Sequence, residues 1–362
     1  MRIGIVTYHR GYNYGVFLQA YATVKYLESL GHAVELIDYT NKHEEEQKRW
    51  IYKEKGEISG YVSSFIKNVV FGKMKYSSMA FNKAIELYPL SKRRYTLPDQ
   101  MNDLSFDVLL VGSDQVWNPD ISSGIDPVFL LMFGHAEKRI SYASSLGSAK
   151  LSKDELKTFK IAFEKFNSIS VREDYAKATL QPITNKEIAV VADPTFLLNQ
   201  EQWITFADRY SSLKKPKEHY ILTYFITPDK DRFEELVSTY ARKFNLPVWS
   251  IQFSNFKRKY SNKLILGATP SDYINLFRYA DLVITDSFHG TAFSINMNVN
   301  FISMKYRANP MRAINLLEKV GLSNRLDMTP EDYTEIDYGK VNPLLEEMRK
   351  ESRDWLVHAL DS

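Results

Sequence analysis

The stretch MRIGIVTYHRGYNYGVFLQAYATVKYLESLGHAVELIDYT, residues 1–40, decides the fold class. It opens with an apolar run at residues 3–7, which is typical of a buried strand. The apolar spacing over residues 15–30 then predicts a helix, and Gly31 supplies a residue type that commonly follows a helix end. A second apolar run occupies residues 34–39. A strand, a helix and a second strand in this order predict a parallel βαβ unit.

Further apolar runs continue this alternation, and each ends in a polar or glycine-rich loop. They occupy residues 106–112, 139–143, 168–172, 189–193, 220–225, 247–251, 280–286 and 300–304. Ligands of open α/β sheets bind at the carboxyl ends of the strands. The loops after these runs are therefore the first place to look for functional residues.

The alternation of strand and helix patterns is interrupted at SSLKKPKE, residues 211–218, which has the composition of an exposed linker. We therefore predict an N-terminal α/β domain over 1–210 and a C-terminal α/β domain over 216–340. The helical pattern at 341–362 predicts a terminal helix that packs back toward the N-terminal domain. Two Rossmann-like domains that face each other across a cleft would form a GT-B-like architecture.

Residues 42–100 lack the strand and helix alternation and contain more Lys and Arg than Glu, interleaved with aromatic residues. We predict a mostly helical insertion in the N-terminal domain. A solvated amphipathic cover over the sheet edge is favoured, and a surface that contacts a membrane peripherally is the alternative.

The composition and the missing motifs exclude several functional classes. The 362 residues are 44% hydrophobic and 25% charged, as in ordinary globular proteins, and cysteine is absent, which excludes a thiolate nucleophile and a cysteine zinc site. The net charge of +3 and the lack of nucleic-acid-binding motifs predict no nucleic-acid partner. Nicotinamide, P-loop and zinc-protease motifs are missing and the histidines are scattered, so we predict neither a cofactor nor a metal site.

No secretion signal precedes the first strand, and no apolar run approaches the ~20 residues that span a bilayer. We therefore expect a cytoplasmic protein. It would work at the inner face of the cell membrane if the 42–100 segment docks there.

The most informative motif is TDSFHGTAFS, residues 285–294, in which a strand ends just before a helix. A helix start carries a partial positive charge and can hold a phosphate or carboxylate. An imidazole at His289 could pair with that anion or transfer a proton near neutral pH. The alternative is that Ser287 only caps the helix and His289 is a loop histidine with satisfied hydrogen bonds.

Six short motifs in order resemble the polysaccharide pyruvyl transferase family, and the resemblance extends to about residue 325. They are Asn13-Tyr14-Gly15, Leu18-Gln19-Ala20-Tyr21, Gly112-Ser113-Asp114-Gln115-Val116-Trp117-Asn118, Ser170-Val171-Arg172-Glu173, Val191-Ala192-Asp193-Pro194 and Asp286-Ser287-Phe288-His289-Gly290. Two positions depart from the pattern of ketal-forming members. Ser287 stands where they often have arginine, and Val16 where they often have aspartate.

The resemblance implies that phosphoenolpyruvate, the donor, binds in the C-terminal domain. Its contacts would be Ser287, His289, Gly290, Thr291, Lys305, Arg307 and Arg312. His289 would act as acid or base or orient the phosphate, and Arg172 would hold the anion through its forked guanidinium. Two alternatives stay open: Arg172 could be a surface residue paired with Glu173 or Asp174, and Arg312 could lie on a solvated helix face.

The resemblance also implies that the acceptor sugar binds on the N-terminal domain. Amide and carboxylate groups bind hydroxyls, and an aromatic ring can cover the C–H face of a sugar. The candidate acceptor residues are Asn13, Tyr14, Gln19, Asp114, Trp117 and Asn118. Core packing is the favoured interpretation of Trp117 taken alone, and a cap of the turn at Pro194 is that of Asp193.

The predicted function is transfer of a ketal-forming pyruvyl group from phosphoenolpyruvate to a sugar of a bacterial surface polysaccharide or its lipid-linked precursor. Two alternatives remain at this point. One is a GT-B glycosyltransferase that uses a nucleotide sugar, and the other is a non-catalytic protein that binds sugars or anions on the same scaffold.

Overall fold

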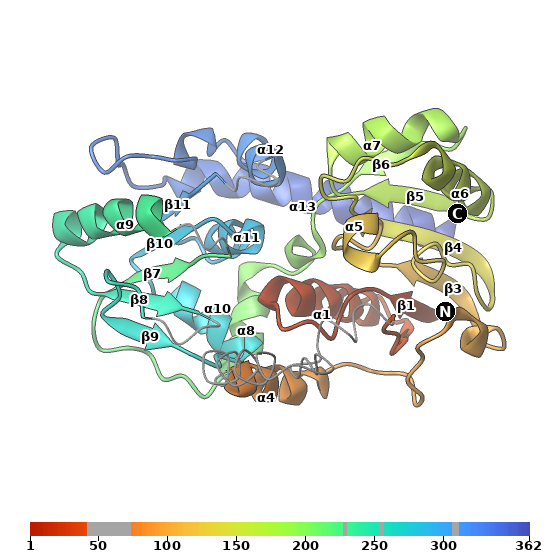
Figure 1. The fold of residues 1–362 in the computed structure, drawn as a ribbon, viewed down its shortest axis with the longest axis horizontal. Helices are drawn as coiled ribbons and strands as arrows, with labels where there is room; N and C mark the ends of the chain where they lie inside the picture. The colour runs from red at the N-terminus through yellow and green to blue at the C-terminus, as the bar shows by residue number, and fades with distance from the viewer. Residues whose placement is uncertain (42–73, 227–229, 253–256, 306–310) are drawn as a thin grey trace, which may run out of the picture. The chain divides into compact units, whose positions relative to one another are not determined.

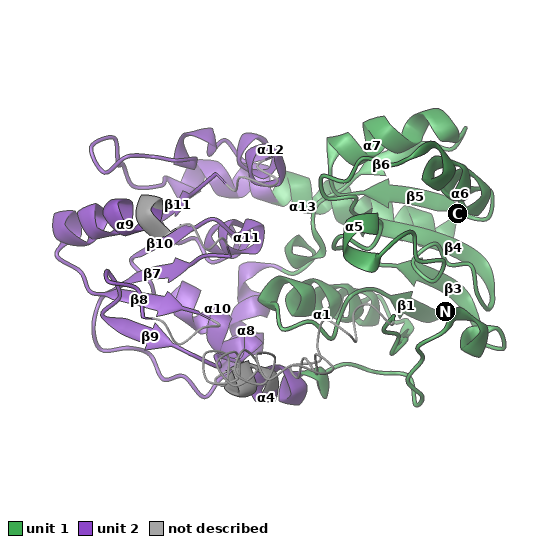
Figure 2. Cartoon of the chain, viewed as in Figure 1, with its two compact units in different colours: residues 1–49, 85–198, 346–362 green, residues 50–84, 199–345 purple. Residues whose placement is uncertain are grey.

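A computed structural model describes residues 1–41, 74–226, 230–252, 257–305 and 311–362 (Figure 1). The chain divides into two compact units (Figure 2). The first comprises the described residues of Met1–Arg49, Ile85–Leu198 and Glu346–Ser362, and the second those of Trp50–Ala84 and Asn199–Leu345. Each unit is built around its own parallel sheet.

The sheet of the first unit has the strand order β2-β1-β3-β4-β5-β6 among the described residues, with every pair parallel. Its strands are β1 (Arg2–Val6), β2 (Ala33–Leu36), β3 (Ser105–Val111), β4 (His135–Ser144), β5 (Ser168–Val171) and β6 (Ile188–Val190). Its helices are α1 (Tyr14–Ser29), η1 (Pro98–Met101), α5 (Pro119–Ser122), α6 (Lys153–Phe163), α7 (Asp174–Leu180), η2 (Gln181–Ile183) and η3 (Pro194–Phe196).

Helices cover both faces of this sheet. On one face, Phe159 and Phe163 of α6 belong to the same apolar core as Leu109 of β3 and Ile169 of β5. On the other face, Tyr142 of β4 contacts Trp355, in the long terminal helix α13 (Tyr338–Asp361), with ring centroids 6.2 Å apart. A sheet buried on both faces explains why its strands are continuous apolar runs.

The sheet of the second unit has the order β11-β10-β7-β8-β9 among the described residues, again all parallel. Its strands are β7 (Ile221–Tyr224), β8 (Val248–Ile251), β9 (Lys263–Ile265), β10 (Leu282–Thr285) and β11 (Phe301–Ser303). Its helices are α4 (Met74–Ile85), α8 (Gln200–Tyr210), α9 (Lys230–Phe244), α10 (Pro270–Arg278), α11 (Phe288–Asn296), α12 (Met311–Lys319) and η4 (Ser323–Arg325).

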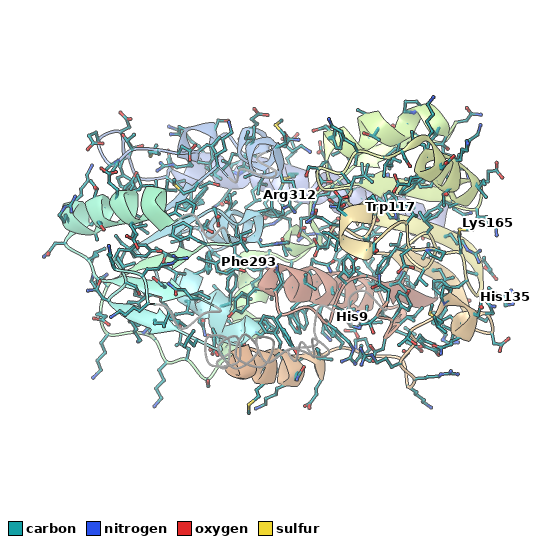
Figure 3. All side chains as sticks on the ribbon, in the orientation of Figure 1. His9, Trp117, His135, Lys165, Phe293 and Arg312 are labelled. Atoms are coloured by element: carbon teal, nitrogen blue, oxygen red, sulfur yellow. The ribbon has the colours of Figure 1, made fainter. Side chains whose placement is uncertain are left out.

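Aromatic side chains pack the helices of the second unit against its sheet. Tyr240 of α9 packs in one core with Ile221 and Ile284. On the opposite face, Tyr273 of α10 contacts Tyr224 of β7 edge to face, with centroids 5.4 Å apart. Phe293 of α11, which is labelled in Figure 3, packs against Tyr273 as well, so α10 and α11 share that face.

The expected strands and the main helices are present, with differences in detail. The sequence placed the domain boundary in the 211–218 linker, but α8 precedes that linker and belongs to the second unit. The Ser211 hydroxyl just after α8 donates to Asp272 of α10 at 2.6 Å. The short edge strand β9 was not predicted, and α13 starts at Tyr338 and contains Pro343.

The predicted insertion can be judged only in part, because residues 42–73 lie outside the described residues. Helix α4 agrees with a helical segment, but it belongs to the second unit and not, as predicted, to the N-terminal domain. Residues 86–97 do not agree with a helical insertion: this segment runs beside β2 through isolated bridges, which join Leu36 to Leu90 and Tyr39 to Tyr95. None of the described helices is long and apolar enough to cross a membrane.

Candidate functional sites at the sheet edges

Each sheet has one point at which successive connections leave in opposite directions. In the first unit this point lies between β1 and β3, and in the second it lies between β7 and β10. Helices diverge from the carboxyl edge of a parallel sheet at such a switch point, which is where open α/β sheets bind their ligands. The predicted acceptor and donor motifs follow β1, β3 and β10, so both fall at these edges.

The start of α11 is built on close backbone packing at the end of β10. The Ser287 hydroxyl accepts from the Gly290 N–H at 3.3 Å and caps the helix, as the capping interpretation predicted. A Cβ on Gly290 would lie 2.3 Å from Thr285 Oγ1, so only glycine allows α11 to approach the strand so closely. The glycine of the motif therefore has a packing role.

His289 lies in the first turn of α11 and is 8% exposed, so it is not a loop histidine. Its ring contacts Phe288 edge to face, with centroids 5.1 Å apart. The Arg312 guanidinium lies 5.6 Å from the centroid of the Phe288 ring. Arg312 thus comes from α12 toward the start of α11, in contrast to the alternative of a solvated helix face (Figure 3).

The other predicted donor residues lie in different surroundings. The Thr291 hydroxyl is fully buried and shares a hydrogen bond of 2.8 Å with Ser303, which ties α11 to β11. Lys305 is exposed at the end of β11, and Arg307 lies outside the described residues. No role was predicted for Asp286, a buried residue whose Oδ1 accepts from the Ile226 N–H at 2.7 Å across the switch point. The sequence could have pointed to this residue, because it lies between the end of β10 and Ser287, the cap of α11.

Polar groups also link β1, β3 and α1 at the first switch point. The Thr7 hydroxyl donates to the Ser113 carbonyl at 2.8 Å and accepts from Gln19 Nε2 at 3.1 Å. Asn13 caps α1, because its Oδ1 accepts from the Gly15 N–H at 2.8 Å. Gln19 is fully buried and Tyr14 is 1% exposed, so both support this edge from inside.

The loop after β3 contains one strained residue. Asp114 adopts φ 70°, an unusual value for a residue other than glycine, and its side chain is 13% exposed. Asn118 caps α5 and donates to Gln115 Oε1 at 2.9 Å. Trp117, which is labelled in Figure 3, is 1% exposed, and its ring packs against that of Phe159. The core interpretation of Trp117 is therefore correct, and its ring has no open face for a sugar.

Arg172 is buried among carboxylates. Its Nη1 donates to Asp193 Oδ2 at 2.7 Å, its Nε donates to Glu173 Oε1 at 3.0 Å, and its Nη2 lies 4.0 Å from Asp114 Oδ1. Burial alone would lower the pKa of the guanidinium, but the charges of Glu173, Asp193 and Asp114 raise this pKa above its ordinary value. Three carboxylates around one guanidinium leave a net negative environment, which disfavours an anion clamp.

Asp193 also caps the turn at Pro194, as expected. Its Oδ1 accepts from the backbone N–H of Thr195 at 3.0 Å and from the Thr195 hydroxyl at 2.8 Å. The same carboxylate therefore joins the turn after β6 to Arg172 after β5.

A second ion pair joins the ends of β1 and β2. Arg10 donates twice to the Asp38 carboxylate, at 2.5 Å each, and His9 Nε2 lies 3.2 Å from the same group. Burial alone would raise the pKa of the Asp38 carboxyl. The hydrogen bonds and charges of His9 and Arg10 outweigh burial and hold that pKa far below its ordinary value.

Asp38→Asn is therefore expected to lower the free energy of unfolding by about 3 kcal/mol at pH 7. Because the folded-state pKa is depressed, this stabilisation is present above the unfolded pKa of about 3.9 and is lost as the pH falls further. Urea unfolding of the two proteins at pH 7, 5 and 3 should show the same gap at pH 7 and 5 and a narrower gap at pH 3, where the loss has begun. Asp154→Asn, at an exposed pair with Lys157, is the matched control and should change little. A gap of equal size at pH 3 would contradict the assignment.

Among the described residues, no group of three or more His, Cys, Asp or Glu side chains could hold a metal ion.

Two solved structures are reported among those similar to this chain. The UDP-GlcNAc 2-epimerase from Neisseria meningitidis bound to UDP-GlcNAc is 8% identical, with a TM-score of 0.52, and the match covers 99% of each chain. A putative UDP-N-acetylglucosamine 2-epimerase from Listeria monocytogenes is 11% identical, with a TM-score of 0.49, over 99% of this chain and 91% of that one. The likeness to the first shows a GT-B-type fold of two Rossmann-like α/β units, and at this identity it shows nothing further.

Among curated proteins the comparison found no match. The sequence model of one family, described as polysaccharide pyruvyl transferase, matches residues 13–308. That span runs from Asn13, the cap of α1, past the start of α11. The chain belongs to the polysaccharide pyruvyl transferase family.

Proposed function

We propose that this protein transfers the pyruvyl group of phosphoenolpyruvate to two hydroxyls of a sugar, forming a cyclic ketal and releasing inorganic phosphate. The acceptor is a sugar of a bacterial surface polysaccharide or of its lipid-linked precursor. Family membership supports pyruvyl transfer. The observation that carries the proposal is the start of α11, where a capped helix end, His289 and the Arg312 guanidinium come together.

The donor is a small molecule with a phosphate and a carboxylate, so its site must offer positive charge. The N-terminus of α11 provides the positive end of a helix dipole, and Arg312 adds a permanent cation beside Phe288. Ser287 and Gly290 shape this helix end. In the proposal, Lys305 at the end of β11 adds a second cation when the donor binds.

The chemistry requires proton transfer at each step. A proton is added to the methylene carbon of phosphoenolpyruvate, and one sugar oxygen bonds to the central carbon while its hydroxyl proton leaves. The second hydroxyl then attacks the same carbon and loses its proton, the carbon–oxygen bond to phosphate breaks, and phosphate departs with the electron pair and takes up a proton. In the proposal, His289 carries a proton or orients the phosphate, because an imidazole does both near neutral pH.

In the proposal, the acceptor binds at the switch point of the first unit. Asn13 and the partly exposed Asp114 carboxylate are suited to hydrogen-bond sugar hydroxyls. Arg172 is given a positioning role in place of donor binding, since its guanidinium lies between Asp193, Glu173 and Asp114. The loops at this switch point are supported by four buried side chains, those of Tyr14, Gln19, Trp117 and Asn118.

Phosphoenolpyruvate is an intermediate of central metabolism, so we place the reaction in the cytoplasm. A lipid-linked acceptor would bring the protein to the inner face of the cell membrane.

The test is a turnover assay with the full chain, phosphoenolpyruvate and a panel of free and lipid-linked oligosaccharides, in which released phosphate is measured. Phosphate release that depends on both the donor and one acceptor is the expected result, with a matching gain of the pyruvyl mass on the sugar. The matched control is the same acceptor with its hydroxyls methylated, which should give no release. Release of a nucleoside diphosphate from a nucleotide sugar, without phosphoenolpyruvate turnover, would overturn the proposal.

A further inference from the structure

The segment that leads from α8 into β7 carries a group of exposed cations. Residues 209–219 contain four Lys and Arg residues and a single carboxylate, that of Glu218. The cations are Arg209, Lys214, Lys215 and Lys217, and all four are exposed. Within the part of the chain that the structure describes, none of the four forms an ion pair, and the neighbouring Asp208 is already held by Arg278 at 2.7 Å. The segment therefore presents a net positive charge to solvent.

The backbone of this segment is fixed on both sides of its lysines. Before them, the Ser211 hydroxyl and the Leu213 N–H both donate to Asp272 Oδ1, at 2.6 and 3.2 Å. After them, the Tyr220 N–H donates to Asp281 Oδ2 at 2.9 Å. Both carboxylates belong to the second unit, so the lysines are presented from a defined place on that unit.

Two tyrosines lie beside the cations, at the ends of the neighbouring helices α8 and α10 (Figure 1). The Arg209 guanidinium lies 5.3 Å from the centroid of the Tyr210 ring, and Tyr210 is 37% exposed. The Lys215 Nζ lies 5.9 Å from the centroid of the ring of Tyr279, which is partly exposed. Such contacts position a cation without neutralising its charge. Basic side chains together with partly exposed tyrosines are typical of surfaces that lie at the headgroup level of a bilayer.

We propose that these cations and tyrosines form a docking surface for a bilayer that contains anionic lipids. The basic surface consists of Arg209, Tyr210, Lys214, Lys215, Lys217 and Tyr279. It deepens the proposed function and rests on it for its purpose, because the surface would hold the enzyme where a lipid-linked acceptor lies. Basic residues near an anionic membrane each strengthen binding several-fold, so the three lysines together correspond to about 100-fold.

The charge distribution favours a bilayer over a nucleic acid. The whole chain has a net charge of only +3, and a nucleic-acid-binding surface usually extends over a larger basic patch or stripe. The four cations of the basic surface lie in one short segment together with tyrosines, which suits a flat layer of anionic headgroups.

The experiment is co-sedimentation of the full chain with vesicles of phosphatidylcholine, with and without phosphatidylglycerol, at low salt. Wild-type protein should bind the vesicles that contain phosphatidylglycerol, and added salt should weaken that binding. Lys214→Gln/Lys215→Gln/Lys217→Gln should reduce the binding constant by about 100-fold. Tyr210→Ser should reduce it by a few-fold without any change of charge.

The matched control is Lys153→Gln/Lys160→Gln/Lys165→Gln, which makes the same change of net charge at three exposed lysines of the first unit. Binding of this control should be nearly unchanged. The thermal melting of both triple variants should match that of wild type, since all six lysines are exposed. Equal loss of binding in both variants, full binding by the 214–217 variant, or wild-type protein that ignores phosphatidylglycerol would each overturn the proposal.

Competition distinguishes a bilayer from other anions. Inorganic phosphate, or a short DNA duplex at the same phosphate concentration as the phosphatidylglycerol, should leave vesicle binding largely intact. Complete displacement by either competitor would show a phosphate site or a general polyanion site, and the docking surface would be wrong.

Turnover separates this surface from the proposed function. With phosphoenolpyruvate and a free sugar, the 214–217 variant should turn over as fast as wild type, because no membrane is involved. A wild-type protein that binds the vesicles but shows no such turnover would refute the proposed function and leave the docking surface standing.

Discussion

Arg172→Ala is expected to destabilise the first unit by about 3–5 kcal/mol, a large fraction of the stability of a domain. The reason is that alanine leaves three carboxylates together without their cation. The side chains of Asp193 and Glu173 are 0% and 5% exposed, and that of Asp114 is 13% exposed. Urea unfolding gives the magnitude, and hydrogen exchange of β5 and β6 would locate the loss.

Two variants make this expectation specific. Arg172→Lys keeps the charge but lacks the fork that reaches Glu173 and Asp193 together, so an intermediate loss is expected. Arg278→Ala removes a partly exposed pair with Asp208 and should change stability by no more than about 1 kcal/mol. If Arg172→Ala folds as stably as wild type and only weakens binding of phosphoenolpyruvate, the anion clamp predicted from sequence is right and the structural role is wrong.

His289→Gln is expected to lower turnover by about 10²–10⁴-fold, as is typical when a proton-transferring side chain is lost. Glutamine is preferred to alanine because His289 is 8% exposed within α11, and truncation there would leave a cavity. Phosphoenolpyruvate binding should be retained in large part, since the helix end and Arg312 remain. Initial rates of phosphate release and a titration of donor binding measure the two effects separately.

His219→Ala is the matched control, because the side chain of His219 is 79% exposed and pairs with Asp281 at the opposite end of the strands in the same unit. It should leave turnover unchanged. A His289→Gln variant that keeps full turnover per folded molecule would make His289 a packing residue and remove it from the proposed chemistry.

The parallel sheets could be predicted because buried strands leave a strong signal. Runs such as residues 106–112 are apolar on both faces, and β3 occupies Ser105–Val111. The edge strand β9 could not be predicted, since Lys263–Ile265 is short and partly exposed. The bridges of Leu90 to Leu36 and of Tyr95 to Tyr39 were missed for a related reason, because isolated backbone pairs impose no side-chain period.

The site was predictable at the level of loops but not of side chains. The motif at 285–290 does end a strand and start a helix, and Ser287 does cap it. The guanidinium of Arg172 donates a hydrogen bond to Asp193, a residue 21 positions away that follows a different strand. A sequence presents both residues as strand-end polar groups and does not say whether the arginine faces a ligand or a carboxylate. Trp117 was correctly favoured as core because tryptophan is large and mostly apolar.

The assembly of the first unit from separated stretches has a consequence for biosynthesis. Its sheet is complete at Leu198, but the part of α13 that packs on Tyr142 begins only at Glu346, about 150 residues later. At a translation rate of about 5–20 residues per second, the sheet waits roughly 7 to 30 s for that helix. During this interval the second unit emerges from the ribosome and can close first. The unit translated first is therefore completed last, and the part of its sheet that α13 covers stays open until that helix arrives.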